Sequence, residues 1–315
     1  MTLPDDLLAR HPREGVRLVL RRQLAHVVAA SRRVVVEHDP AALHDLRRMA
    51  RELRVTVGSH AHLVPRRVAR RSRKRLATLI TATGLARDVE VALALLGTRH
   101  EAGCAQAIAH ARSAWERRER HLRKRLARVV VHEVPRIERA LDAALRRYRV
   151  NVSPTSPPLF IDEVRRAIEA AAERLQAALH AALENGSQPR ADRVLHKARL
   201  AAKRLESLLQ PFAILRTELR AVIAQLRGFE DAIGDLRDER LLQLALEHEA
   251  LCCGGALRVE LERLAMTLGR GSRTAQLSTA ADVLRAFCLD TAALHAGLAD
   301  TASPRALTSS EPGAS

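Results

Sequence analysis

Two stretches of this chain repeat one pattern at helical spacing. Leu43–Leu53 and Leu195–Leu205 both read Leu-His-x-x-Arg-x-x-x-(Arg or Lys)-x-Leu. A second pattern follows each of them in the same order, as Gly84-Leu-Ala-Arg-Asp88 and Gly234-Asp-Leu-Arg-Asp238. Two patterns that recur in the same order indicate a duplicated structural unit.

The composition predicts that this unit is helical. The chain is 47% hydrophobic but only 2% aromatic, and its apolar residues are mostly Ala, Leu and Val. Ala and Leu favour helices, and 14 Gly with 12 Pro provide for few tight turns. No stretch alternates polar and apolar residues as a hairpin sheet does. We therefore expect an all-α fold.

Proline, glycine and polar clusters predict where the helices end. They place helices at about 5–37, 40–62, 65–84, 84–96 and 101–149 in the first half. The second half resumes helix at 159, with breaks at 185–189, near 234, at 254–255 and near 269. The resulting organisation is a first helical repeat at 5–150, a Pro/Ser-rich linker at 151–158, a second repeat at 159–300 and a disordered tail at 301–315.

The charge balance predicts an anionic partner. Lys and Arg number 53 against 36 Asp and Glu, which gives a formal net charge of +17. Such a surplus attracts polyanions: nucleic acid, an anionic membrane or polyphosphate. The 4 cysteines show no CxxC spacing and are interpreted as small buried hydrophobic residues. Without a signal core or an apolar run long enough for a membrane span, we expect a cytoplasmic protein and no membrane partner.

The repeated pattern places its basic residues on one side of a helix. Because each residue advances about 100°, His44, Arg47, Arg51 and Arg54 fall within an arc of about 80°. The leucines lie on the opposite side and are expected to pack. A charged outer face is the ordinary explanation for such a strip. Against it stand the recurrence of the strip in both halves, the lack of alternating acidic partners and the histidine among the cations.

Both stretches resemble the signature of the CHAD family, the conserved-histidine α-helical domain. This resemblance covers roughly 5–299 and implies two four-helix bundles related by a pseudo-twofold axis around a basic central cavity. It also implies binding of inorganic polyphosphate and association with polyphosphate granules. The matched positions that would bind are His44, Arg47, Arg51, Arg54, His196, Arg199, Lys203 and Arg204. Weaker candidates are Arg21, Arg22, Arg73, Lys74 and Lys197.

The chain departs from the family pattern at two acidic positions. Glu52 and Glu206 stand where the family often has another arginine, and Ser207 stands where an aromatic residue is common. These carboxylates are expected to reduce the positive potential at the rim of the site, and so to affect affinity more than the kind of ligand.

The chemistry of the residues fits a phosphate polymer independently. Arginine offers a planar fork for two phosphate oxygens, and lysine acts as a point charge. A polyphosphate has no rings to read, and this chain, with 1 Trp, 1 Tyr and 4 Phe, has few of the stacking side chains that single-strand nucleic-acid binders use. The basic runs at 66–75 and 117–128 are interpreted mainly as solvent-facing. Arg87-Asp88 and Arg237-Asp238 are interpreted as ion pairs at helix junctions.

An enzymatic function is the weaker hypothesis. His44-Asp45 is the dipeptide of HD-type metal phosphohydrolases, and His26 or His38 with Asp88 would complete a metal site. The second copy reads His196-Lys197, however, and a protonated lysine cannot ligate a metal. We therefore predict no enzyme activity, no catalytic residues and no cofactor.

Two further functional classes are alternatives to polyphosphate binding: CYTH-type triphosphatases and nucleic-acid-binding proteins. The string nearest to the Glu-x-Glu-x-Lys hallmark of CYTH-type triphosphatases is Glu260-Leu-Glu-Arg263, which has Arg for Lys and lies in an amphipathic helical pattern, so we discount it. A nucleic-acid-binding protein is the stronger rival, because the positive field attracts DNA or RNA whatever the true ligand is.

Overall fold

The computed structural model describes residues 2–37, 40–99, 103–146, 159–185, 191–270, 280 and 282–299. These residues form helices and connecting turns and contain no strand, which confirms the all-α fold class. The predicted linker at 151–158 and the predicted tail at 301–315 lie outside the described residues. The helices are α1 (Pro12–Arg32), α2 (Pro40–Ser59), α3 (Arg66–Gly97), α4 (Ala105–Arg146), α5 (Phe160–Asn185), α6 (Ala191–Leu209), α7 (Glu218–Leu251), α8 (Gly255–Arg270) and α10 (Thr291–Leu298).

Proline sets several of the helix starts. Pro12 and Pro40 are the first residues of α1 and α2, where the missing N–H has no intrahelical partner to lose. Pro65 stands immediately before α3. At α10 the Asp290 carboxylate accepts a hydrogen bond of 2.8 Å from the Ala293 N–H and caps the helix.

Two predicted helix boundaries are wrong. Neither Gly84 nor Gly234 breaks a helix, because α3 and α7 continue through them, whereas the break predicted near Gly269 agrees with the end of α8 at Arg270. A single glycine costs a helix only about 1 kcal/mol, which packing readily outweighs. The predicted helix at 5–37 is also divided, into the 3-10 turn η1 (Leu7–Ala9), α1 and the π-helical turn η2 (Arg33–Glu37).

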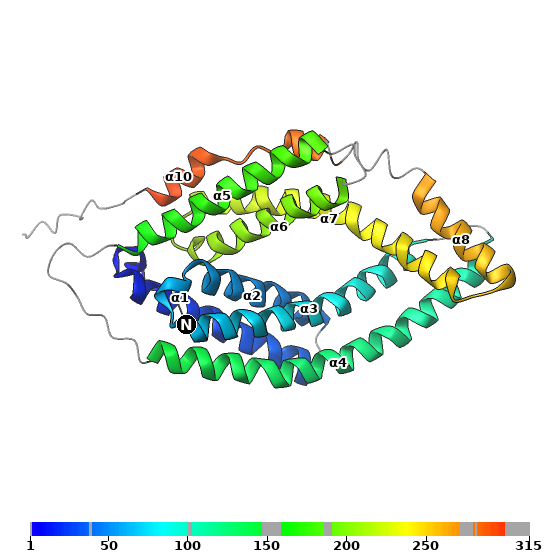
Figure 1. Cartoon of the computed structure of the whole chain (residues 1–315), viewed down its shortest axis with the longest axis horizontal. Coiled ribbons are helices and arrows are strands. Elements are labelled where there is room, and N and C mark those ends of the chain that lie inside the picture. Colours follow the sequence, from blue (N-terminus) through cyan, green and yellow to red (C-terminus); the bar gives the residue numbers. More distant parts are fainter. Residues whose placement is uncertain are drawn as a thin grey trace, which may run out of the picture.

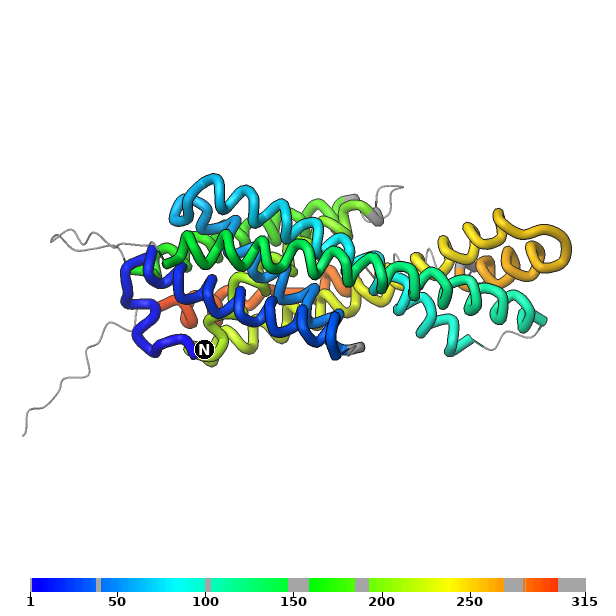
Figure 2. The backbone as a smooth tube through the Cα atoms, turned by 90° about the horizontal axis from the view of Figure 1, so that it is seen from below, coloured from blue at the N-terminus to red at the C-terminus, as the bar shows by residue number. Residues whose placement is uncertain are grey.

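The helices form an elongated body with a narrower end (Figures 1 and 2). In the main part, α2 packs between α1 and α3 and also contacts α6, while α6 packs on α5 and α7. The C-terminal parts of α3 and α7 extend into the narrow end, where α8 packs on α7 and α4. The long helix α4 begins in this end and runs back along α3. The main part holds one hydrophobic core with residues from both halves of the chain, and the narrow end holds a second, smaller core around Trp115.

Phe160 joins the two halves where α5 begins. Its side chain is 1% exposed, and its ring lies 5.9 Å from the Phe212 ring and 6.2 Å from the His60 ring, measured between centroids. Its N–H donates a hydrogen bond of 2.8 Å to the Arg10 carbonyl. A Cβ on Gly15 of α1 would lie 2.2 Å from this ring, so only glycine fits at that position. The start of the second half is therefore packed into the core of the first.

The structure corrects the interpretation of the cysteines as buried residues. All four cysteines are free, but only Cys104 is buried, whereas Cys252 and Cys288 are exposed. The latter two lie near helix ends.

None of the described helices combines the length and the apolar character that a bilayer span requires.

Candidate functional site

The two repeated helices α2 and α6 border one groove. Side chains of α3 and α7 complete it, and its volume is about 700 Å³. His44 from the first half and His196 from the second both line it. The basic strips predicted from the two copies of the motif therefore face the same space.

Cationic side chains dominate the lining of the groove. Eight Lys or Arg residues contribute to it, four from the first half and four from the second: Arg47, Arg48, Arg51, Arg87, Arg199, Lys203, Arg227 and Arg237. Among the residues described, the lining includes only two apolar residues, Val91 and Leu200, and no Phe, Tyr or Trp. Such a groove offers many phosphate contacts and no platform on which a base could stack.

Arg47 and Arg199 are held in matching positions in the two halves. Arg47 Nη1 donates to the Ile80 carbonyl at 2.6 Å, and Arg199 Nε donates to the Glu230 carbonyl at 3.3 Å. Each carbonyl precedes a glycine by four residues, and that glycine lies under the guanidinium. A Cβ on Gly84 would come within 2.6 Å of Arg47 Nη1, and one on Gly234 within 3.0 Å of Arg199 Nη2. The glycines of the repeated Gly-x-x-Arg-Asp motif thus provide space for the groove arginines.

Replacing both glycines should weaken anion binding without unfolding the protein. Alanine is worth up to about 1 kcal/mol more than glycine inside a helix, which offsets the cost of displacing the two guanidinium groups. We expect the Gly84→Ala/Gly234→Ala variant to bind polyanions about tenfold more weakly, with a melting temperature close to that of the wild type. Gly228→Ala on α7 is the control, because nothing lies within 4 Å of its Cβ. Equal affinity of the double variant and wild type, measured by calorimetry, would remove the role given to the glycines.

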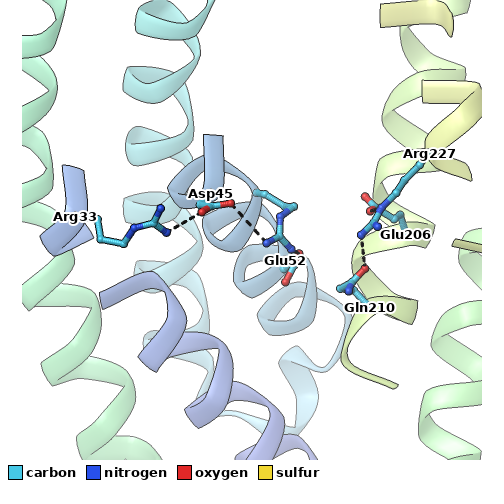
Figure 3. Close-up of polar contacts among 7 residues, drawn as sticks. Arg33, Asp45, Glu52, Glu206, Gln210 and Arg227 are labelled. Carbon is cyan, nitrogen blue, oxygen red and sulfur yellow. Dashed lines mark hydrogen bonds and ion pairs between the residues drawn. The ribbon is translucent and has the colours of Figure 1, made fainter. Parts of the chain in front are cut away.

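Carboxylates also line the groove, which the strips alone did not predict. Six contribute: Asp45, Asp88, Glu206, Glu230, Asp231 and Asp238. Several are paired, as Figure 3 shows for Asp45 with Arg33 at 2.8 Å and for Glu206 with Arg227 at 2.8 Å. The Lys203 ammonium lies 3.4 Å from a Glu230 carboxylate oxygen. The cations outnumber these acids by two, so the groove keeps a positive surplus while holding its arginines in place.

Burial and mutual repulsion destabilise the charged forms of the groove cations. An anion bound in the groove would stabilise these charged forms. Burial, together with the charge of Arg51, lowers the pKa of Arg47 to about 10. Burial lowers the pKa of His44, and Arg87 and Arg48 lower it further. Burial, Arg237 and Arg199 have the same effect on the pKa of His196. A bound anion would oppose these shifts because it stabilises the charged form of each cation.

The metal site of the enzymatic hypothesis has no support in the described part of the chain. There, no three His, Cys, Asp or Glu side chains are placed to share a metal ion. The Asp45 carboxylate is engaged by Arg33 at 2.8 Å and by Arg48 at 3.8 Å. His38 lies outside the described residues.

A comparison with protein-family models identifies the family of this chain. The sequence model of the CHAD domain matches residues 18–247. The chain belongs to the CHAD family. The match includes both copies of the repeated motif and every residue that lines the groove. No curated protein matches the sequence significantly.

Two solved structures share the CHAD architecture of this chain. One is the crystal structure of the CHAD domain from the plant Ricinus communis, with a TM-score of 0.69 and 19% sequence identity, covering 92% of this chain and 96% of that chain. The other is PptA from Streptomyces chartreusis, with a TM-score of 0.60 and 18% identity, covering 88% of this chain and 100% of that chain. At these identities the likeness concerns the fold.

Six of the eight residues matched to the CHAD signature come together in the groove. They are His44, Arg47, Arg51, His196, Arg199 and Lys203. The other two, Arg54 and Arg204, do not line it. Arg204 instead donates a hydrogen bond of 3.0 Å to the Ser59 hydroxyl, and its pKa is lowered by burial and by the nearby charges of Arg174, Arg73 and Arg54. These four arginines form a separate basic cluster contributed by α2, α3, α5 and α6.

The weaker candidates lie away from the groove that the CHAD signature residues form. Arg21 borders a pocket between α1 and α4, Lys74 borders one between α3 and α4, and Arg73 belongs to the basic cluster. Arg22 and Lys197 do not line the groove, and Lys197 is exposed.

Sequence reasoning did not place four of the groove arginines: Arg48, Arg87, Arg227 and Arg237. Arg237 does form an ion pair, at 3.5 Å to Asp88 of the other half. The expected helix junction is absent, however, because both residues lie within continuous helices that reach the groove. The recurrence of Gly-x-x-Arg-Asp was the signal that could have placed Arg87 and Arg237 in the site.

Proposed function

We propose that this CHAD protein binds inorganic polyphosphate in the groove between α2, α3, α6 and α7, and that binding brings it to polyphosphate granules. The observation that carries the proposal is the convergence of basic residues from both repeated motifs on one groove. Each phosphate of the polymer carries negative charge and acceptor oxygens, which match guanidinium forks and need no base-reading group. The CHAD resemblance points to the same ligand.

We further propose that the protein acts by binding and carries out no reaction of its own. Arg47 and Arg199 each donate to a backbone carbonyl and retain further N–H groups for a ligand. Two fixed forks facing one groove can hold phosphates of the same chain. The carboxylates of the groove form ion pairs with neighbouring cations and can hold these cations in position.

A competition experiment tests the identity of the ligand. Labelled long-chain polyphosphate is titrated with the protein at physiological salt, and duplex DNA of equal charge concentration is added as competitor. We expect polyphosphate to remain bound, because a flexible chain without bases can enter a groove that a duplex cannot. Displacement of polyphosphate by duplex DNA at equal charge would favour nucleic acid as the ligand instead. Colocalisation of the tagged protein with stained granules tests the cellular part of the proposal.

Binding should strengthen as the pH falls from 8 to 6. The pKa values of His44 and His196 are lowered in the free groove, and a bound polyanion raises them. The complex therefore binds more protons than the free protein, so added protons favour the complex. Calorimetric titrations across this pH range at constant ionic strength should show a rising affinity. An affinity that is flat or falls toward pH 6 would contradict this electrostatic account.

A further inference from the structure

The most unusual contact in the groove is a buried pair of opposite charges. The side chains of Lys203 and Glu230 are 16% and 8% exposed, and the ammonium lies 3.4 Å from Glu230 Oε2. The other carboxylate oxygen, Oε1, is buried and has no hydrogen-bond partner in the described structure. A carboxylate with one unsatisfied buried oxygen is poorly solvated in its charged form.

Charges from three helices surround this pair. Arg51 of α2 acts on both members, Arg199 and Glu206 reach it from α6, and Asp231 and Arg227 flank Glu230 on α7. The charge of Lys203 also acts on His44 of α2 and His196 of α6, and these histidines are unchanged in every variant compared below. Burial raises the pKa of Glu230 to about 7, and burial with the charges of Arg51 and Arg199 lowers the pKa of Lys203 to about 8. Both groups thus titrate close to neutral pH.

The sequence of the first half has no counterpart to this pair. Counted from the signature histidines, Lys203 corresponds to Arg51, and counted from the groove glycines, Glu230 corresponds to Ile80. The first half therefore has a permanently charged arginine and an apolar residue at these two positions. The second half has a titratable base and a titratable acid, so its side of the groove can change its charge through the pair.

We propose that Lys203 and Glu230 couple capture of the anionic chain to the uptake of one proton. In the free groove the acid neutralises the base, which leaves the pair without net charge. When phosphate oxygens approach Lys203, a proton from solvent adds to a Glu230 carboxylate oxygen. The acid then becomes neutral, and the ammonium is released from it to contact phosphate. This inference rests on the proposed function, because it concerns the ligand of the same groove.

Calorimetry in buffers of different ionisation enthalpy measures the protons taken up per bound chain. At pH 7.5 we compare Lys203→Arg with Lys203→Arg/Glu230→Gln. The arginine cannot titrate, and the first half already uses arginine at this position. Removing the acid should lower proton uptake by more than about half a proton. The control is Lys203→Arg/Glu247→Gln, which removes one exposed carboxylate of α7 that does not line the groove and should leave proton uptake unchanged.

The outcomes separate this inference from the proposed function. Equal uptake in Lys203→Arg and Lys203→Arg/Glu230→Gln would overturn it, as would an equal loss in the Glu247 control. If the wild type fails to bind polyphosphate at all, the proposed function fails instead. Should the double variant not fold, difference infrared spectra of the wild type decide the point. They should show one carboxylate becoming protonated on binding, and their failure to do so would overturn the inference.

Discussion

Polyphosphate binding will fall at least about 100-fold when four groove cations are reversed to glutamate. The four are Arg47, Arg51, Arg199 and Lys203, all of which line the groove. Reversal removes the phosphate contacts and adds repulsion in a partly buried site, where charges are weakly screened. The dependence of affinity on salt should also become shallower, because about one counter-ion fewer is released for each lost contact.

The control for this experiment makes the same change in net charge at a different location. Arg70, Arg71, Arg118 and Arg128 are exposed on α3 and α4 and do not line the groove. Reversing these four changes the total charge equally, so it should reduce affinity only several-fold through the long-range field. Because reversal at buried arginines can disturb folding, a second set carries glutamine at the groove positions. Equal losses in the groove and control sets would show that the groove is not the site.

The Phe160→Ala variant will lose about 3–5 kcal/mol of unfolding free energy. Phe160 is 1% exposed and packs between Phe212 and Gly15, so truncation leaves a cavity where the two halves meet. Chemical denaturation measures the loss. Leu251→Ala is the control, because Leu251 is 73% exposed and should change stability by less than about 0.5 kcal/mol.

The same experiment tests whether the two halves share one core. A shared core predicts that Phe160→Ala destabilises both halves together, so that the circular dichroism of the whole chain shows one transition that shifts as a unit. A loss below about 1 kcal/mol would show that the contact contributes little. Separate transitions, with only one shifted by the substitution, would show that the halves fold independently.

Local rules predicted the fold class and six residues that line the candidate groove. The spacing of His44, Arg47 and Arg51 fixes a common helix face, and repetition of the pattern predicts that a second such face exists. The contribution of α3 and α7 was not predictable in this way, because it depends on how helices pack. Carboxylates such as Glu230, and arginines such as Arg87, enter the groove from segments distant in sequence.

Glycine was the most misleading signal. Gly84 and Gly234 were expected to end helices, since glycine weakens them. Both instead remain within helices and leave room for a guanidinium from the neighbouring helix. Arg54 shows the converse limit: it shares the helix arc of Arg51 but lies one turn beyond the groove and belongs to the arginine cluster around Arg204. Periodicity predicts the face of a helix and cannot predict how far along it a site extends.

A structure of the protein in complex with polyphosphate tests the central claim most directly. The account predicts a chain of phosphorus atoms along the groove between the helices of His44 and His196, with phosphate oxygens in hydrogen-bond contact with the Arg47 and Arg199 guanidinium groups. A chain bound to the exposed basic surface of α4, with the groove left empty, would contradict it.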